Sequence, residues 1–470
     1  MCKNYSAMLA LTVQLGVLTF GAPLAQAQIT VGPNIDVSSA RASTPHLEVV
    51  IAADPENPNG LIACSMVPDG VAAYISDNGG VTWSAPVIVT GAPRINDPTC
   101  AYGPGGVVYF AHKLKETAGP SDLDRLEVHR SRDGGKTWDE MIRGPQTTDR
   151  PWIAVDMRPE RGPWGRLYVS YNYHVHGEAT ELNHSGDAGW LNAVALQASD
   201  DGGKTFTTFA MRALVGDSAH PHRQPDMGGT AVLSDGTVVV LYEHAVGGGL
   251  NPKTHKTFIV QSALMLLRSS DRGDSFDPVN TVADIKTSYN EPHTRGVTAT
   301  LAVDPGSPAF RDRLYTVWGD VRTGRTEIMI ASSPDKGKTW SAPVTVSDAP
   351  QVARDSGGPD QFMPTVAVNK EGIVGVLWYD RRDNPNNRDY YARFSASLDG
   401  GATWLKSVRV SSSANEPGKK GGSVTNGDTS GLAASADGRF HALWIDNRTG
   451  TPQAWTAAIT VAGKPVAAGR

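Results

Sequence analysis

A short motif, Ser-x-Asp-x-Gly-x-Thr-Trp or a close variant of it, occurs six times in this chain of 470 residues. The starts of successive copies are separated by 55, 68, 70, 64 and 64 residues. Recurrence at such a period is typical of a repeat architecture, so each copy should hold the same place in a repeated unit. The copies are SDNGGVTW, SRDGGKTW, SDDGGKTF, SSDRGDSF, SPDKGKTW and SLDGGATW, beginning at Ser76, Ser131, Ser199, Ser269, Ser333 and Ser397.

The residue types of the motif predict a tight turn between two strands. An Asp or Asn side chain accepts hydrogen bonds from backbone N–H groups in such turns, and glycine adopts the positive φ that they need. The aromatic residue then anchors the turn. We therefore expect a structural role for the acidic or amide position of every copy, which is Asn78, Asp133, Asp201, Asp271, Asp335 or Asp399.

The repeated octapeptide resembles the Asp-box, or BNR repeat, of the sialidase-like β-propellers, and the resemblance covers almost the whole chain after residue 27. In that family the box joins the third and fourth strands of a four-stranded blade, on the face opposite the active site. The resemblance therefore implies a propeller whose chemistry lies on the face without the boxes.

Each box is preceded by a polar residue and a proline, and then by two short runs rich in β-branched and aromatic residues, which are typical of strands. The pattern begins a seventh time with TSGLAASADG, RFHALWIDNR and QAWTAAITV, but no seventh box follows. Near the N-terminus, ITVGPNIDVS resembles the fourth strands of the other units, so we predict that it completes the last blade and removes its open edge. The expected fold is an all-β, seven-bladed propeller of four-stranded antiparallel blades, with six blades as the alternative.

The first residues have the order of a secretory signal: Lys3, an apolar stretch over residues 7–20, and Ala25-Gln26-Ala27 as a small-residue cleavage site. We divide the chain into a signal peptide (1–27), a single β-propeller domain (28–461) and a C-terminal tail (462–470). The protein is expected to be secreted or periplasmic.

Charge and hydropathy restrict the partners. The formal net charge is −5 and the pI about 6.2, and no basic run alternates with aromatic residues, so we expect no nucleic-acid partner. No segment reaches 18 uninterrupted apolar residues, so we expect no membrane insertion, and we expect a monomer. Cys64 and Cys100 lie in neighbouring predicted blades, and both a disulfide and two buried thiols are open for them.

The loops opposite the boxes should surround the central mouth, and they are rich in histidine and arginine. Arginine presents a planar donor fork that matches a carboxylate, so several of them suggest an anionic sugar, although salt bridges between blades would use the same side chains. Asp97, Asp149, Asp226 and Glu291 accompany them. The candidates for substrate binding here are Arg150, Arg223, Arg295, His174, His222 and His244.

Three late units each contain a Trp-x-Asp-x-Arg motif, at Trp318–Arg322, Trp378–Arg382 and Trp444–Arg448. Alternate residues of a strand share a face, so the three side chains of each motif should meet. Repetition favours a structural brace over a site. Arg322 and Arg382 are kept as candidates for substrate binding because they stand where the second strand reaches the mouth.

Sialidases use an arginine triad, a tyrosine nucleophile activated by a glutamate, and an aspartate as acid/base. Carried over by this resemblance, the catalytic candidates are Asp97, Glu291, Tyr379 and Tyr390. The Phe/Tyr-Arg-Ile-Pro that precedes the first box of sialidases is absent, and its nearest echo, Arg94-Ile95-Asn96, follows the box. The first arginine of the triad is therefore unassigned.

The resemblance implies a carbohydrate-active protein, most simply a sialidase-like exo-glycoside hydrolase acting on a terminal anionic sugar. One alternative is a polysaccharide lyase or rhamnosidase-like seven-bladed enzyme that uses His, Tyr and Arg. Another is a propeller that binds a glycan or a protein without catalysis. We expect no cofactor, since no HExxH or comparable spacing is present, although the clustered histidines leave a bound metal open.

Overall fold

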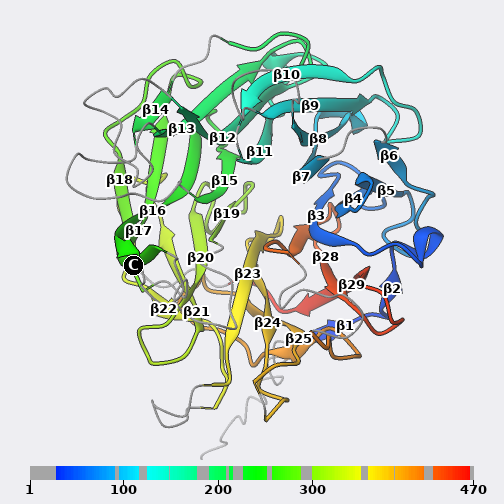
Figure 1. The fold of residues 1–470 in the computed structure, drawn as a ribbon, viewed down its shortest axis with the longest axis vertical. Coiled ribbons are helices and arrows are strands. Elements are labelled where there is room, and N and C mark those ends of the chain that lie inside the picture. Colours follow the sequence, from blue (N-terminus) through cyan, green and yellow to red (C-terminus); the bar gives the residue numbers. More distant parts are fainter. Residues whose placement is uncertain are drawn as a thin grey trace, which may run out of the picture.

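The chain folds as a ring of seven antiparallel sheets around a central axis, with the first strand of each sheet nearest the centre (Figure 1). The structure is a computed structural model that describes residues 28–89, 95–115, 124–147, 149–176, 190–207, 211–214, 226–250, 257–286, 299–350, 358–385, 387–417 and 427–465. Among these residues, the helical elements are three short 3-10 turns, and no helix is long and apolar enough to span a membrane. The prediction of a seven-bladed, all-β propeller is confirmed.

Each of the first four blades is formed by four consecutive strands, which run from the centre of the ring outward. Blade one contains β3 (Leu47–Ala53), β4 (Leu61–Val67), β5 (Gly70–Ser76) and β6 (Val87–Val89). Blade two contains β7 (Ile95–Tyr102), β8 (Val108–Lys115), β9 (Asp124–Ser131) and β10 (Ile142–Thr147). Blade three contains β11 (Asp149–Asp156), β12 (Arg166–His176), β13 (Trp190–Ser199) and β14 (Met211–Leu214). Blade four contains β15 (Asp226–Val232), β16 (Val238–Leu250), β17 (Thr257–Ser269) and β18 (Asn280–Ile285).

The last three blades follow the same order, except that blade seven takes its outer strands from the start of the chain. Blade five contains β19 (Thr300–Val303), β20 (Leu314–Asp320), β21 (Glu327–Ser333) and β22 (Val344–Thr345). Blade six contains β23 (Gln361–Val368), β24 (Val374–Asp380), β25 (Tyr391–Ser397) and β26 (Val408–Arg409). Blade seven contains β27 (Gly431–Ala434), β28 (Phe440–Asp446), β29 (Gln453–Ala462), β1 (Gln28–Val31) and β2 (Ile35–Asp36).

The ring closes between the two ends of the sequence, as predicted. β1 pairs with β29 in a register that runs from Gln28 opposite Ala462 to Val31 opposite Ile459, and β2 adds a short pairing with the same strand. The third and fourth strands of blade seven are therefore not consecutive in sequence, and no turn joins them. This explains why six boxes accompany seven blades, because the box is the turn between those two strands.

All six boxes form the same hydrogen-bonded turn at the end of the third strand. The serine hydroxyl donates to the acidic or amide side chain two residues later, and the glycine N–H donates to the serine oxygen. In blade two these distances are 2.7 Å from Ser131 to Asp133 and 2.8 Å from Gly135 to Ser131. The boxes are structural, as their residue types indicated, and Asn78 serves in blade one where aspartate serves elsewhere.

The hydrophobic core consists of seven clusters, each of which lies between two neighbouring blades. The cluster between blades one and two contains Cys64 and Cys100. Both cysteines are free and buried, so the structure has two buried thiols and not a disulfide. Burial raises the pKa of the Cys64 thiol.

Candidate active site

The first strand of several blades begins with a bulge that turns one side chain toward the mouth. In blades one, two, three and six the strand register shifts at this point, and the bulged residue has a positive φ of 50°, 52°, 47° and 50°, respectively. A non-glycine residue rarely adopts this conformation, and such strain is concentrated at functional sites. The bulged residues are Glu48, Asp97, Arg150 and Met363.

These side chains line two adjoining hollows at the centre of the ring. The first hollow includes Glu48, Asp97, Arg150, Trp152 and Asp428. The second shares Arg150, Trp152 and Asp428 with the first, and the hollows together are lined from all seven blades. The bulges therefore aim side chains from four blades at a common mouth, and in two of these blades the bulged residue is a polar residue directly before a proline, Asp97 or Arg150.

Arg150 is held by carboxylates of other blades. Its guanidinium forms ion pairs with Asp428 of blade seven and with Asp226 of blade four, the latter at 3.7 Å. Its backbone N–H donates to Asp97 at 3.2 Å. The sequence left substrate binding and salt bridges between blades as alternatives for Arg150, and in the structure its side chain forms the salt bridges.

Asp97 and Asp149 form a partly buried pair around the ammonium group of Lys113. The Nζ atom lies 2.9 Å from Asp97 and 2.7 Å from Asp149, and Asp124 approaches it at 3.5 Å. Burial raises the pKa of Asp97 to about 6; the Lys113 ammonium opposes this rise, whereas neighbouring Asp149 adds to it. Burial alone would raise the pKa of Asp149, but its hydrogen bond with Asp97 and the charge of Lys113 hold it below its usual range.

The pair therefore separates into a proton donor and an ionised carboxylate. Environments that push the pKa values of two carboxyl groups apart are how proteins obtain an acid and a base from the same residue type. Asp97 keeps its proton up to a pH of about 6, well above the range of an ordinary carboxyl group, and it reaches the hollow that Glu48 also lines. This arrangement is suited to general acid catalysis.

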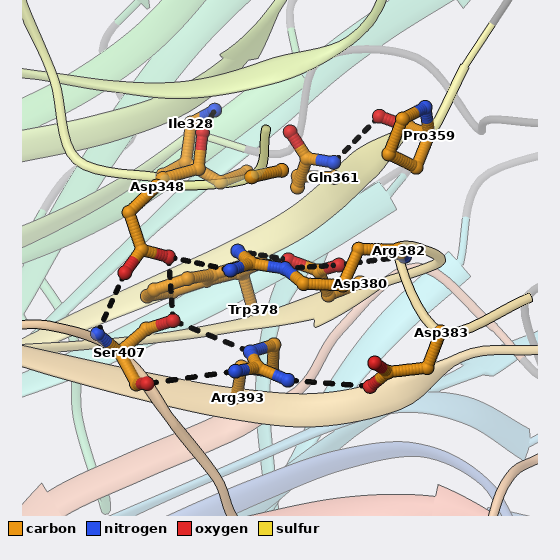
Figure 2. Close-up of polar contacts among 12 residues, drawn as sticks. Ile328, Asp348, Pro359, Gln361, Trp378, Asp380, Arg382, Asp383, Arg393 and Ser407 are labelled. Atoms are coloured by element: carbon orange, nitrogen blue, oxygen red, sulfur yellow. Dashed lines mark hydrogen bonds and ion pairs between the residues drawn. The ribbon is translucent and has the colours of Figure 1, made fainter. Parts of the chain in front are cut away.

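Arg322 and Arg382 belong to braces. In blade six, Trp378 donates its indole N–H to Asp380 at 2.9 Å, and Arg382 grips Asp380 through Nε and Nη2 at 2.9 and 2.7 Å (Figure 2). Arg382 also binds Asp348, which receives hydrogen bonds from Ser407 (Figure 2). Neither arginine lines the two central hollows, and Arg322 lines a separate hollow beside Asp284, so both arginines are braces away from the central mouth. The other braces are Trp318, Asp320 and Arg322, and Trp444, Asp446 and Arg448.

Replacing Asp380 with asparagine is expected to lower the free energy of unfolding by about 3 kcal/mol, because it leaves the Arg382 guanidinium without its buried counter-charge. Urea denaturation of the purified protein measures the loss. The matched control is Asp383→Asn in the same blade. Asp383 forms ion pairs with Arg393 and Arg409 but is 31% exposed, whereas Asp380 is 0% exposed, so the control should lose less than about 1 kcal/mol. Equal losses in the two variants would refute the brace.

The two tyrosines proposed as nucleophiles lie in the core between blades six and seven, where each is 1% exposed. Their rings are 4.7 Å apart, and the hydroxyl of Tyr379 accepts the backbone N–H of Ile445 at 3.2 Å. Burial raises the pKa of both phenols. Tyr379 and Tyr390 are therefore packing residues, and assigning them to catalysis was wrong because no substrate reaches their hydroxyls.

Two histidines of the predicted site lie on hairpins that extend beyond the mouth. β12 and β16 continue past Asn172 and Glu243, which pair with the first residues of β11 and β15. His174 and His244 occupy these extensions. Glu291, Arg223, Arg295 and His222 lie outside the described residues.

Two further histidines, His46 and His112, are buried inside the blades. Burial lowers the pKa of His46 to about 4 and that of His112 to about 3, so both imidazoles are neutral at physiological pH. Conversely, Glu48, Lys113, Trp152 and Asp428 were missed. Of these four residues, Lys113 could most easily have been found from the sequence, because it is a charged residue within the strand Val108–Lys115. The five residues that precede Lys113 in this strand are all buried.

Comparisons with known proteins agree on the repeat. The family model of the BNR/Asp-box repeat matches residues 74–85, around the first box. No curated protein matches the sequence significantly.

Among solved structures, the NanB sialidase of Streptococcus pneumoniae is 10% identical, with 92% of this chain and 98% of that chain covered and a TM-score of 0.44. The intramolecular trans-sialidase of Ruminococcus gnavus is 14% identical, with 90% and 96% covered and a TM-score of 0.42. An α-L-arabinofuranosidase of Fusarium graminearum is 14% identical, with 74% and 92% covered and a TM-score of 0.46. At these TM-scores and identities, the similarity does not identify the reaction of this chain.

Proposed function

We propose that this chain, a seven-bladed β-propeller with six Asp-box turns, is a glycoside hydrolase with its active site at the central mouth. The observation that carries the proposal is the Asp97–Asp149 pair around Lys113, in which burial raises the pKa of Asp97 at the hollow to about 6. Export through the N-terminal signal and a monomeric state are parts of the same proposal.

Asp97 is the general acid of this mechanism. It protonates the leaving oxygen of the glycosidic bond, and the Lys113 ammonium stabilises the carboxylate that results, whereas the charge of Asp149 favours return of the proton. Glu48 lines the same hollow from the neighbouring blade and is the second carboxylate, which attacks the anomeric carbon or activates water. Trp152 lines both hollows and offers an apolar ring face to the sugar.

The charge of the mouth bears on the choice of sugar. In the part that the structure describes, the mouth has two cationic side chains, Lys113 and Arg150, and a larger number of carboxylates. Both cations form ion pairs with these carboxylates. Such a field disfavours an anion and favours an uncharged sugar. The anionic sugar expected from the sequence would depend on Arg223 and Arg295. The carboxylates of the mouth are Glu48, Asp97, Asp149, Asp226 and Asp428.

A panel of glycosides tests the proposal. Purified protein is incubated with neutral glycosides, sialosides and uronic-acid polysaccharides, with released sugar and the absorbance of unsaturated products measured separately. Release of a neutral sugar is expected. Release of sialic acid would show that the substrate is an anionic sugar and not a neutral one. Formation of unsaturated products would indicate a lyase. No turnover with retained glycan binding would overturn catalysis and leave a binding propeller.

The activity should depend on the proton of Asp97. We expect kcat/KM to fall above pH of about 6, by roughly tenfold per pH unit, since the raised pKa of Asp97 marks the loss of the acid. The Asp149→Asn substitution removes a neighbouring negative charge that raises the pKa of Asp97. In this variant the fall of kcat/KM, which is the alkaline limb of the pH profile, should therefore begin at lower pH. A pH profile of the two proteins measures the shift, and an unmoved limb would contradict the assignment of Asp97.

A further inference from the structure

Blade two contains a second cluster of polar side chains, on the side of its sheet that faces blade one. His112 lies on β8 opposite Glu127 on β9, and His129 on β9 lies opposite Phe110. Phe110 belongs to the core between blades one and two, and its ring packs against both imidazoles. His112 and Glu127 are 0% and 3% exposed, whereas His129 is partly exposed.

The donor atoms of the three side chains converge. Nε2 of His112 lies 3.1 Å from Nε2 of His129 and 3.6 Å from a carboxylate oxygen of Glu127, and the donor atoms all lie within 4.8 Å of one another. We propose that His112, Glu127 and His129 bind a divalent transition-metal ion of the zinc type.

Two of the three donor separations agree with the bond lengths of such an ion. Ligand bonds of about 2.0–2.1 Å in a tetrahedral site place neighbouring donor atoms roughly 3.3 Å apart. The 3.1 and 3.6 Å separations stand on either side of that value. Two imidazoles and one carboxylate are also a donor set that zinc accepts, with one position left for water.

The position in the fold suggests what the ion does. The ligands come from adjacent strands, so the ion links β8 to β9, and it balances the charge of a carboxylate that is almost fully buried. Lys113, next to His112 in sequence, faces the opposite side of the sheet and contacts the mouth. The metal site is therefore separate from the proposed active site and does not depend on the proposed function. The partial exposure of His129 provides a path of entry.

A hydrogen bond between neutral imidazoles also accommodates a 3.1 Å separation, so the test must measure the ion itself. Full-length mature protein without a polyhistidine tag is treated with a chelator, desalted, and titrated with Zn²⁺ alone. Metal content is measured after desalting, and Co²⁺ alone is added in a parallel sample to record the absorption bands of a four-coordinate site. We expect one ion per chain and a raised melting temperature with Zn²⁺.

Two variants and a control decide the outcome. Glu127→Gln keeps the shape of the side chain and His129→Asn removes the more exposed ligand; each should weaken Zn²⁺ binding by roughly 100-fold and abolish the Co²⁺ bands. His441→Gln is the control, because His441 is a buried histidine that bonds to Ser435 and has no place in the cluster. Its metal content should be unchanged.

The proposal is overturned if the parent protein retains no ion, or if Glu127→Gln binds Zn²⁺ as tightly as the parent. Circular dichroism in the presence of chelator checks that each variant is folded. If His129→Asn fails to fold, the isosteric Glu127→Gln variant decides alone. Loss of glycosidase activity is not a readout here, so failure of this site and failure of the active-site proposal are distinguishable.

Discussion

Asp97→Asn is expected to lower kcat/KM on a glycoside with a poor leaving group by roughly 100- to 10,000-fold, which is the usual contribution of a general acid. Asparagine has nearly the same shape but cannot donate the proton to the leaving oxygen. Steady-state kinetics on the substrate found with the panel measure the loss. Urea denaturation of the same sample separates it from any loss of stability caused by the altered contact with Lys113, which lies 2.9 Å from Asp97.

The leaving group provides the sharper form of this experiment. An aryl glycoside with an acidic phenol needs little protonation, so Asp97→Asn should lose far less activity on it than on an alkyl glycoside. The control is Asp133→Asn, the same substitution in the same blade but on the opposite face. The box of blade one uses Asn78 at this position, so the control should remain folded and fully active. Equal losses of Asp97→Asn on both substrates would argue against an acid and for a binding role.

A chain that begins at Val37 instead of Gln28 is expected to lose the stability of the closed ring. It lacks β1 and β2, which pair with β29, and the side chains of Ile29 and Val31 that pack against the core between blades six and seven. The lost hydrogen bonds and apolar contacts amount to about 5 kcal/mol, which is comparable with the total stability of many domains. The exposed edge of β29 should also promote association.

Calorimetry and size-exclusion chromatography of the two chains measure this effect. The shortened chain should melt at a much lower temperature and form oligomers. Addition of a peptide of residues 28–37 should restore the melting temperature in part, whereas a peptide of scrambled order should not. An unchanged, monomeric shortened chain would show that closure by these strands contributes little.

The repeated features were predictable because each depends on contacts within a few residues. The box is closed by hydrogen bonds between residues two to four positions apart, so its residue types alone indicate the turn. The brace likewise joins Trp378, Asp380 and Arg382 on one strand and the turn that follows it, and alternation of side chains predicts it. The missing seventh box, together with the N-terminal strand, then predicted the number of blades and the closure of the ring.

The site was predictable only in part, because its contacts join different blades. Asp97 and Arg150 were correctly placed at the mouth by their positions before proline, but the sequence gives no sign that Arg150 is paired with Asp226 and Asp428. Tyr379 and Tyr390 sit on strands whose exposure depends on how blade seven packs against blade six. Carrying a family role onto them ignored that packing.

From the sequence alone, the repeated octapeptide predicted a propeller, and the seventh unit without a box, together with the N-terminal strand, predicted seven blades and the closure of the ring. Those properties follow from hydrogen bonds and side-chain alternation within a single blade, which the order of residues encodes directly. Only the tertiary structure decided which carboxylates share a proton, which arginines are bound by other blades, and which histidines meet between strands. Distance and burial set these interactions, and both arise only when seven separate sheets close into one ring.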